Sequence, residues 1–159
     1  MSTNRVKPMS ELERRLFLSE MDKLEIVGES LRKNRLYEEA EYIYRKVFLE
    51  IKERLGPDHL QTLRGLCLYG IVIYQKKNFR RAKEIFNDAM KAGILTNQAK
   101  HPFVLQAKHN YAECLLEMQK YSEAEEWFRV ALKERKEIEG AADLSTITSM
   151  IKLAIAIYK

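Results

Sequence analysis

The chain has 159 residues, enough for one ordinary domain, and 46% of them are hydrophobic, enough to form a core. Charged residues make up 32%, above the usual quarter, as expected of a thin fold with a large surface. The net charge of +5 is mild and does not by itself indicate nucleic acid or an anionic membrane. No run of 18 apolar residues occurs, so the sequence predicts no membrane-spanning helix.

The N-terminal part predicts a short arm followed by a long helix. Residues 1–9 are polar and contain Pro8, and we expect them to form a flexible arm. Ser10 and Glu13 form a capping-box pair, which predicts a helix start. The helix is expected to run to Lys33, longer than its counterparts. Its apolar residues recur at three- and four-residue spacing: Leu12, Leu16, Leu24, Val27 and Leu31.

The rest of the chain predicts further helices separated by short turns. Gly56 followed by Pro57 predicts the end of the second helix, because glycine is favoured just past a helix end and proline cannot continue the helix. His59 and His101 each stand just ahead of a helix, and we interpret them as helix-entry residues, not as metal ligands. The expected helices cover residues 37–55, 58–76, 79–95, 102–119, 121–139 and 143–159.

One eight-residue stretch occurs three times along the chain. Its copies begin at Tyr37, Phe79 and Tyr121, so the period is 42 residues. A constant period of this size predicts stacked copies of one helix pair, not a single closed core. The domain is expected over residues 10–159, with repeats at about 17–58, 59–100 and 101–142 and a final unpaired helix at 143–159.

Shifting the chain by the period reveals columns of similar residues. We expect the two columns of small residues to face each other and let the paired helices approach closely. The first small column is Gly28, Gly70, Ala112 and Ala154, and the second is Ala40, Ala82 and Ala124. An aromatic column (Tyr44, Phe86 and Phe128) and a small apolar column (Val47, Ala89 and Ala131) follow.

These columns resemble the tetratricopeptide repeat family over about residues 20–159. The long period, with the segment from Glu53 to His59 between repeats, is similar to the subgroup found in kinesin light chain and related adaptors. The resemblance implies an all-α, right-handed solenoid of antiparallel helix pairs. It also implies that the first helix of each pair lines a concave groove that holds a peptide.

The family's groove positions can be placed on this sequence, and we predict that they bind a peptide. In the first repeat they are Asp22, Glu25, Ile26, Glu29, Arg32 and Lys33. The candidate site in the next two repeats is Arg64, Leu68, Ile71, Tyr74, Gln106, His109, Asn110, Glu113 and Leu116. Asn110 falls where the kinesin-light-chain-like members carry an asparagine that resembles a clamp on the peptide backbone.

The middle of the predicted groove is unusually apolar, which leaves two interpretations open. Leu68, Ile71, Tyr74 and Leu116 could anchor an apolar side chain of a peptide or helix. Alternatively, the long N-terminal helix could fold over the groove and cover them, or fewer of them could be exposed than the family geometry implies.

No catalytic motif was found in the sequence, which has no glycine-rich phosphate loop, GxSxG or HExxH. We therefore expect no catalytic residue, no cofactor and no metal site, and we do not expect an enzyme. Cys67 and Cys114 show no zinc or CxxC spacing and are interpreted as reduced, buried residues of a cytoplasmic protein.

The predicted function is a non-catalytic adaptor or scaffold that binds a protein or peptide partner. The helix at 143–159 is apolar nearly all round, so either the chain is a fragment of a longer array or that edge forms a homodimer or partner contact. A third alternative is the binding of RNA or another acidic surface by a basic edge, although the sequence favours a solvated edge over nucleic-acid binding. That edge contains Arg32, Lys33, Arg35, Lys76, Lys77, Arg80 and Arg81.

Overall fold

The computed structural model describes residues 9–159, and within them it contains seven α-helices and no strand. The predicted flexible arm lies outside the described residues except for Met9. The helices are α1 (Glu11–Lys33), α2 (Tyr37–Leu55), α3 (Leu60–Gln75), α4 (Phe79–Leu95), α5 (Pro102–Glu117), α6 (Tyr121–Ile138) and α7 (Leu144–Ile157).

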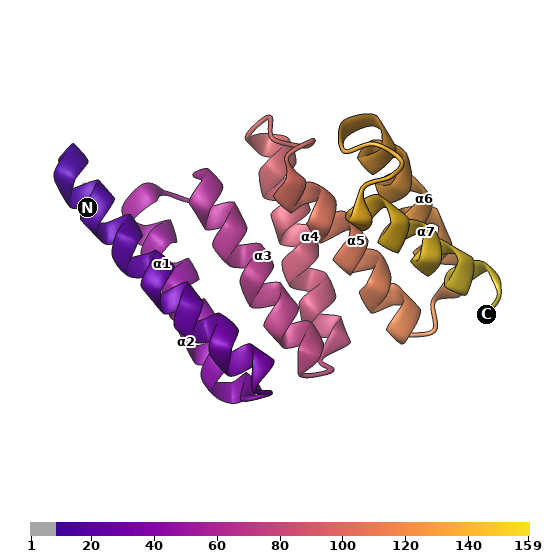
Figure 1. Cartoon of the computed structure of the whole chain (residues 1–159), viewed down its shortest axis with the longest axis horizontal. Helices are drawn as coiled ribbons and strands as arrows, with labels where there is room; N and C mark the ends of the chain where they lie inside the picture. The colour runs from indigo at the N-terminus through magenta and orange to yellow at the C-terminus, as the bar shows by residue number, and fades with distance from the viewer. Residues whose placement is uncertain (1–8) are drawn as a thin grey trace, which may run out of the picture.

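Each helix packs against the next one along the chain, and Figure 1 shows them as one row with the two termini at opposite ends. First helices also meet across the repeats, since α3 contacts α5 and α5 contacts α7. This arrangement confirms the predicted all-α solenoid of helix pairs. It follows from the repeat, because one helix pair cannot bury its apolar face alone.

Local sequence signals set the helix starts as predicted. At α1 the Glu13 amide donates to Ser10 Oγ at 3.2 Å, and the Ser10 amide donates to Glu13 Oε2 at 2.7 Å. His59 and His101 are the N-caps of α3 and α5, where each Nδ1 accepts from the amide two residues on. The interpretation of both histidines as helix-entry residues is therefore confirmed.

The turns inside the helix pairs repeat with the same period of 42 residues. Arg35, Lys77 and Gln119 all adopt the left-handed conformation, with φ of 61°, 62° and 60°. The amide after each of them bonds back to the end of the first helix, as from Leu36 N to Leu31 O at 2.9 Å. This pattern is the Schellman motif, which satisfies carbonyls left free by the helix end.

The close approach within a pair joins glycine to an aromatic ring, which corrects the expected contact between the two small columns. A Cβ added at Gly70 would lie 2.7 Å from Phe86 Cε1, and one added at Gly28 would lie 3.1 Å from Tyr44 Cε2. The nearest atoms thus belong to the aromatic column and not to the alanines. At Gly70 the ring leaves no space for a side chain, whereas the third pair has Ala112 at this position of the column.

The buried face of α1 differs from the one its leucine spacing indicated. Phe17 and Met21 are buried and pack with Val47 and Ile51 of α2. By contrast, three residues of the predicted apolar set, Leu12, Leu16 and Val27, are exposed. The helix carries two apolar faces, and the position of α2 decides which of them is covered.

We expect Gly70→Val to lower the free energy of unfolding by about 1–3 kcal/mol, because the added atoms overlap Phe86 and the core must shift. The matched control is Ala154→Val, which stands in the same column on α7, where the side chain is exposed. That change is expected to cost about 0.5 kcal/mol or less. Urea unfolding of both variants measures the difference, and equal losses would contradict the packing account.

Candidate functional site

Three adjoining cavities form a groove lined mainly by the first helices of the pairs, and we call them together the groove. The largest, of about 1020 Å³, lies between α1 and α3 and includes Glu25, Arg64 and Leu68. A central cavity of about 380 Å³ shares Arg64 and Leu68 with it. The third, of about 370 Å³, shares Gln106 and Arg135 with the central one and reaches the start of α7.

The α1 end of the groove is acidic and is tied to α3 by one arginine. Arg64 Nη2 lies 2.5 Å from Glu25 Oε2, and its Nη1 lies 3.4 Å from Asp22 Oδ1. Glu25 is buried, and this burial raises the pKa of its carboxyl while Arg64 acts in the opposite direction. Five of the six groove positions predicted in the first repeat line this cavity: Asp22, Glu25, Ile26, Glu29 and Lys33.

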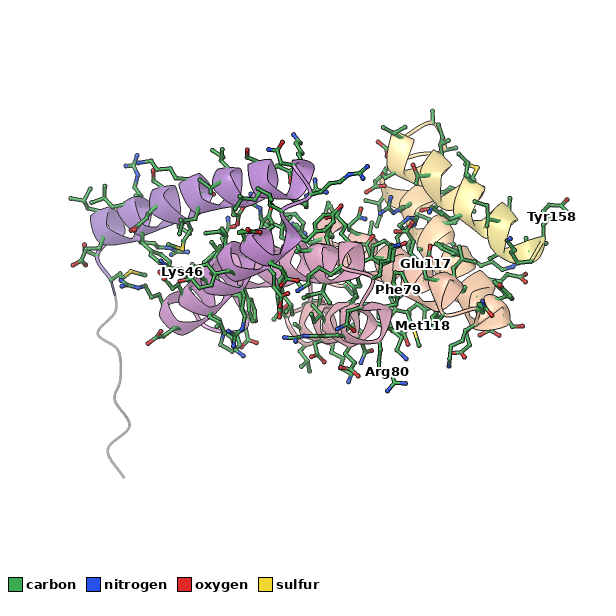
Figure 2. All side chains as sticks on the ribbon, turned by 90° about the horizontal axis from the view of Figure 1, so that it is seen from below. Lys46, Phe79, Arg80, Glu117, Met118 and Tyr158 are labelled. Carbon is green, nitrogen blue, oxygen red and sulfur yellow. The ribbon has the colours of Figure 1, made fainter. Side chains whose placement is uncertain are left out.

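The long N-terminal helix lines the groove and does not cover it. Helix α1 packs against α2 at one end of the row, and Figure 2 shows it as the upper purple helix at the end opposite α7. The alternative in which this helix folds over the groove is therefore wrong.

Four of the predicted site residues lie together at the groove centre. Arg64, Leu68, Ile71 and Gln106 line the central cavity, and all four side chains are partly exposed. Leu68 and Ile71 also pack against the main core, so they form an apolar floor anchored from below. An apolar floor with charged residues at its margins suits a ligand that combines an apolar anchor with polar groups.

Two further predicted residues of α5 are buried, and one of them, His109, contacts α7. His109 is 4% exposed, and its Nδ1 lies 3.0 Å from Ser149 Oγ. Burial, with the nearby cations Arg135 and Lys152, lowers the pKa of His109 to about 3. The imidazole is therefore neutral at physiological pH.

Asn110 is also buried, and its Oδ1 accepts from Gln106 Nε2 at 2.8 Å. The oxygen of the amide that the family resemblance assigns to a peptide clamp is thus already occupied by a neighbouring side chain. The clamp remains a prediction, since an amide oxygen that accepts one hydrogen bond can still accept a second.

The remaining predicted residues take part in contacts between helices. Glu113 Oε1 pairs with Lys152 Nζ of α7 at 2.7 Å. Tyr74 packs its ring against Phe79, with centroids 5.3 Å apart, and Leu116 packs against the cluster under α7. The peptide-binding role predicted for Tyr74, Glu113 and Leu116 stays a prediction.

One groove residue, Arg135, was missed by the sequence analysis. It comes from α6, a second helix, and its side chain reaches the floor of the central cavity. Nη2 donates to Gln106 Oε1 at 3.0 Å, whereas Nε has no partner among residues 9–159. Burial lowers its pKa, against the effect of nearby carboxylates. A signal existed, because the column at this position reads Ile51, Gly93, Arg135.

The basic edge is partly neutralised within the molecule. Arg32 pairs with Glu29 at 2.6 Å, and Lys76 pairs with Glu38 and Glu41 at 2.6 and 2.5 Å. This leaves less free positive charge for a nucleic acid than the sequence alone indicates. Across the described part of the chain, no group of three or more histidine, cysteine or acidic side chains is placed to hold a metal.

Comparison with known proteins agrees with the repeat analysis. Residues 21–93 match the family model described as tetratricopeptide repeat. No curated protein matches the chain at a significant level. Among residues 9–159, no helix combines the length and the apolar character needed to cross a membrane.

Solved structures share the fold of this chain, and two of them are described as having TPR-like repeats. One is a Podosopora anserina protein, described as a kinesin light chain, with nearly identical TPR-like repeats; it shares 17% identity with a TM-score of 0.78 and covers 87% of this chain and 65% of its own. A substituted form of that protein gives the same values. BtubC (BKLC) from P. vanneervenii shares 18% identity with a TM-score of 0.79 over 91% of this chain and 60% of its own. The chain thus spans less than two thirds of these structures, and the likeness concerns the fold.

The buried His109 predicts a pH-dependent stability. Its folded pKa of about 3 lies below the unfolded value, so the unfolded state binds the proton first and stability is lost as the pH falls below about 6.5. Between about pH 7.5 and about pH 5 this group should cost the wild type roughly 2 kcal/mol. The variant His109→Asn lacks the titrating ring. The difference in free energy of unfolding by which it falls short of wild type should therefore be smaller at pH 5 than at pH 7.5 by that amount. Urea unfolding at both pH values measures this, and parallel pH profiles would contradict it.

Proposed function

We propose that the chain is a non-catalytic adaptor or scaffold, because residues 21–93 match the tetratricopeptide repeat model and such repeats generally mediate contacts between proteins and are generally non-catalytic. In this proposal a peptide or helix of a partner protein lies in the groove. The observation that carries it is the continuity of the three cavities across the first helices, from α1 to α7.

The chemistry of the groove supports a peptide as the ligand. Leu68 and Ile71 form its partly exposed apolar floor, and removing such surface from water contributes roughly 25 cal/mol per Å². Arg64 and Gln106 flank that floor with groups that can donate hydrogen bonds to a backbone carbonyl. A segment with an apolar anchor and free backbone groups matches both features.

The location of the protein is part of the same proposal. Cys67 and Cys114 are free and buried, as in proteins kept in a reducing compartment. We place the adaptor in the cytoplasm on this ground, with a protein as its partner.

Selection of peptides on the immobilised protein tests the groove. We expect peptides displayed from a random library to be enriched on the wild type and to lose at least about tenfold in affinity on the double variant Leu68→Glu, Ile71→Glu. The loss follows because two carboxylates would replace the apolar floor, and an apolar anchor bound there would bury them. Fluorescence polarisation with the enriched peptides measures the affinities.

The control for this experiment is Leu95→Glu, which makes the same kind of change on a side chain that is 83% exposed at the end of α4. Circular dichroism establishes that each variant keeps its helices. If the enriched peptides bind the double variant as well as the wild type, the groove is not their site.

A second candidate function, self-association, is favoured by the outer face of α7. Ile147, Ile151 and Ala154 are exposed, although the residues one period earlier, Leu105, His109 and Ala112, are all buried. The face of α7 that corresponds to a covered face of α5 is thus open. The large exposed side chains of α7 are Leu144, Ile147, Ile151, Ile155 and Ile157, and Tyr158 follows at its C-cap.

We propose that two copies of the chain pack through this face, because exposed apolar patches tend to mark contact surfaces. Light scattering over a range of concentrations should then give a mass that rises from monomer to dimer. Ile151→Glu should restore the monomer, whereas Ile94→Glu, at an exposed position on α4, should not. A monomeric wild type at high concentration would rule out this dimer.

A further inference from the structure

The floor of the central cavity holds a cation without a counter-ion. Arg135 is 2% exposed, yet none of the carboxylates among residues 9–159 forms an ion pair with it. Its guanidinium makes one hydrogen bond to a neutral group, Gln106 Oε1 at 3.0 Å, and its Nε has no partner. Buried charges are ordinarily paired, since removal from water is otherwise strongly unfavourable.

The fold does not require a cation at this position. One period earlier the chain has Gly93, and two periods earlier it has Ile51, which is 1% exposed in the core. Both of these repeats pack without a charged side chain at this position. A residue that departs from the pattern of its column without a structural gain indicates a function.

The carboxylates that act on Arg135 are engaged elsewhere. Glu139 lies four residues on in the chain, but its Oε2 accepts from Ser145 Oγ at 2.7 Å. Asp143 caps α7 by accepting from the Ser145 amide at 2.8 Å. Glu113 pairs with Lys152. The structure thus holds each of these acids on another partner and leaves the guanidinium facing the cavity.

We propose that Arg135 binds the carboxylate of an aspartate or glutamate side chain in the partner peptide, which rests on the proposed function of the groove. A planar guanidinium matches a carboxylate, and a charge-assisted bond is stronger than the present one to a neutral amide. The central cavity, at about 380 Å³, is large enough for such a side chain. Gln106 orients the guanidinium from the opposite edge.

A carboxylate fits better than a phosphate because of the local charge. Glu139 and Asp143 stand close enough to influence Arg135, so a group with nearly two negative charges would meet stronger repulsion than a group with one. The acidic α1 end of the groove has the same effect. We therefore expect one acidic side chain at the Arg135 end of the peptide.

The direct test follows the arginine Nε–H signals of the wild-type protein by NMR. The probe is the α-amide of N-acetylglutamate, and its neutral counterpart is the α-amide of N-acetylglutamine. We expect the Arg135 signal to shift saturably with the glutamate probe, with a dissociation constant on the order of millimolar for so small a ligand. The glutamine probe, and sodium chloride at equal ionic strength, should leave it in place. Inorganic phosphate should bind more weakly.

A variant separates binding from a structural role. Arg135→Met replaces the buried charge by an apolar chain of similar length, so without ligand it should raise the melting temperature by about 2–4 °C or more. It should also abolish the shifts that the glutamate probe causes in the backbone amide signals of residues lining the central cavity. The control is Arg129→Met on the same helix, whose side chain is 58% exposed and pairs with Glu125. This change should alter neither property.

Failure of this proposal can be told apart from failure of the proposed function. An Arg135 signal that does not move, or that moves equally with chloride, overturns the carboxylate site whatever the peptide selection shows. A melting temperature that falls in Arg135→Met, with groove peptides bound as before, also overturns it and leaves the groove function intact. A saturable shift together with failed selection of peptides retains the carboxylate site and removes the peptide groove.

Discussion

The close contact between a small residue on one helix, glycine in the first two pairs and Ala112 in the third, and an aromatic ring on its partner determines the geometry of the helix pairs. At Gly70 the ring of Phe86 occupies the volume that any side chain would need, so the two axes come closer than larger residues allow. The same contact recurs at Gly28 with Tyr44. Because pairs of one geometry are stacked at a constant period, the row of helices and the groove along it are consequences of this contact.

Charged side chains join the first helices of adjacent repeats across the groove. Arg64 of α3 holds the buried Glu25 of α1, and Glu113 of α5 holds Lys152 of α7. Each pair spans two repeats, so it stabilises the relative position of neighbouring pairs. Arg135 is different because its charge is buried without such a partner. This contrast between satisfied and unsatisfied charges distinguishes the structural polar groups of the groove from the one suited to a ligand.

Signals that act within a few residues made most helix boundaries predictable. The Ser10 capping box and the His101 N-cap lie at the observed helix starts, since capping depends on local backbone geometry. Burial was less predictable. His109 is covered because α7 packs on α5, a contact across 40 residues of chain. Neither the leucine spacing of α1 nor the family's groove positions contain that information.

The sequence by itself determined the helices, their period and the all-α solenoid. Hydrophobic spacing and caps act locally, and the constant period means that every helix pair repeats the packing of one. Tertiary structure decided which faces are covered. It placed Leu68 at the groove floor, buried Asn110 beside Gln106, and brought Arg135 from a second helix to the cavity. Side-chain exposure depends on neighbours distant in sequence, and a column comparison can flag an arginine without showing that its charge is unpaired.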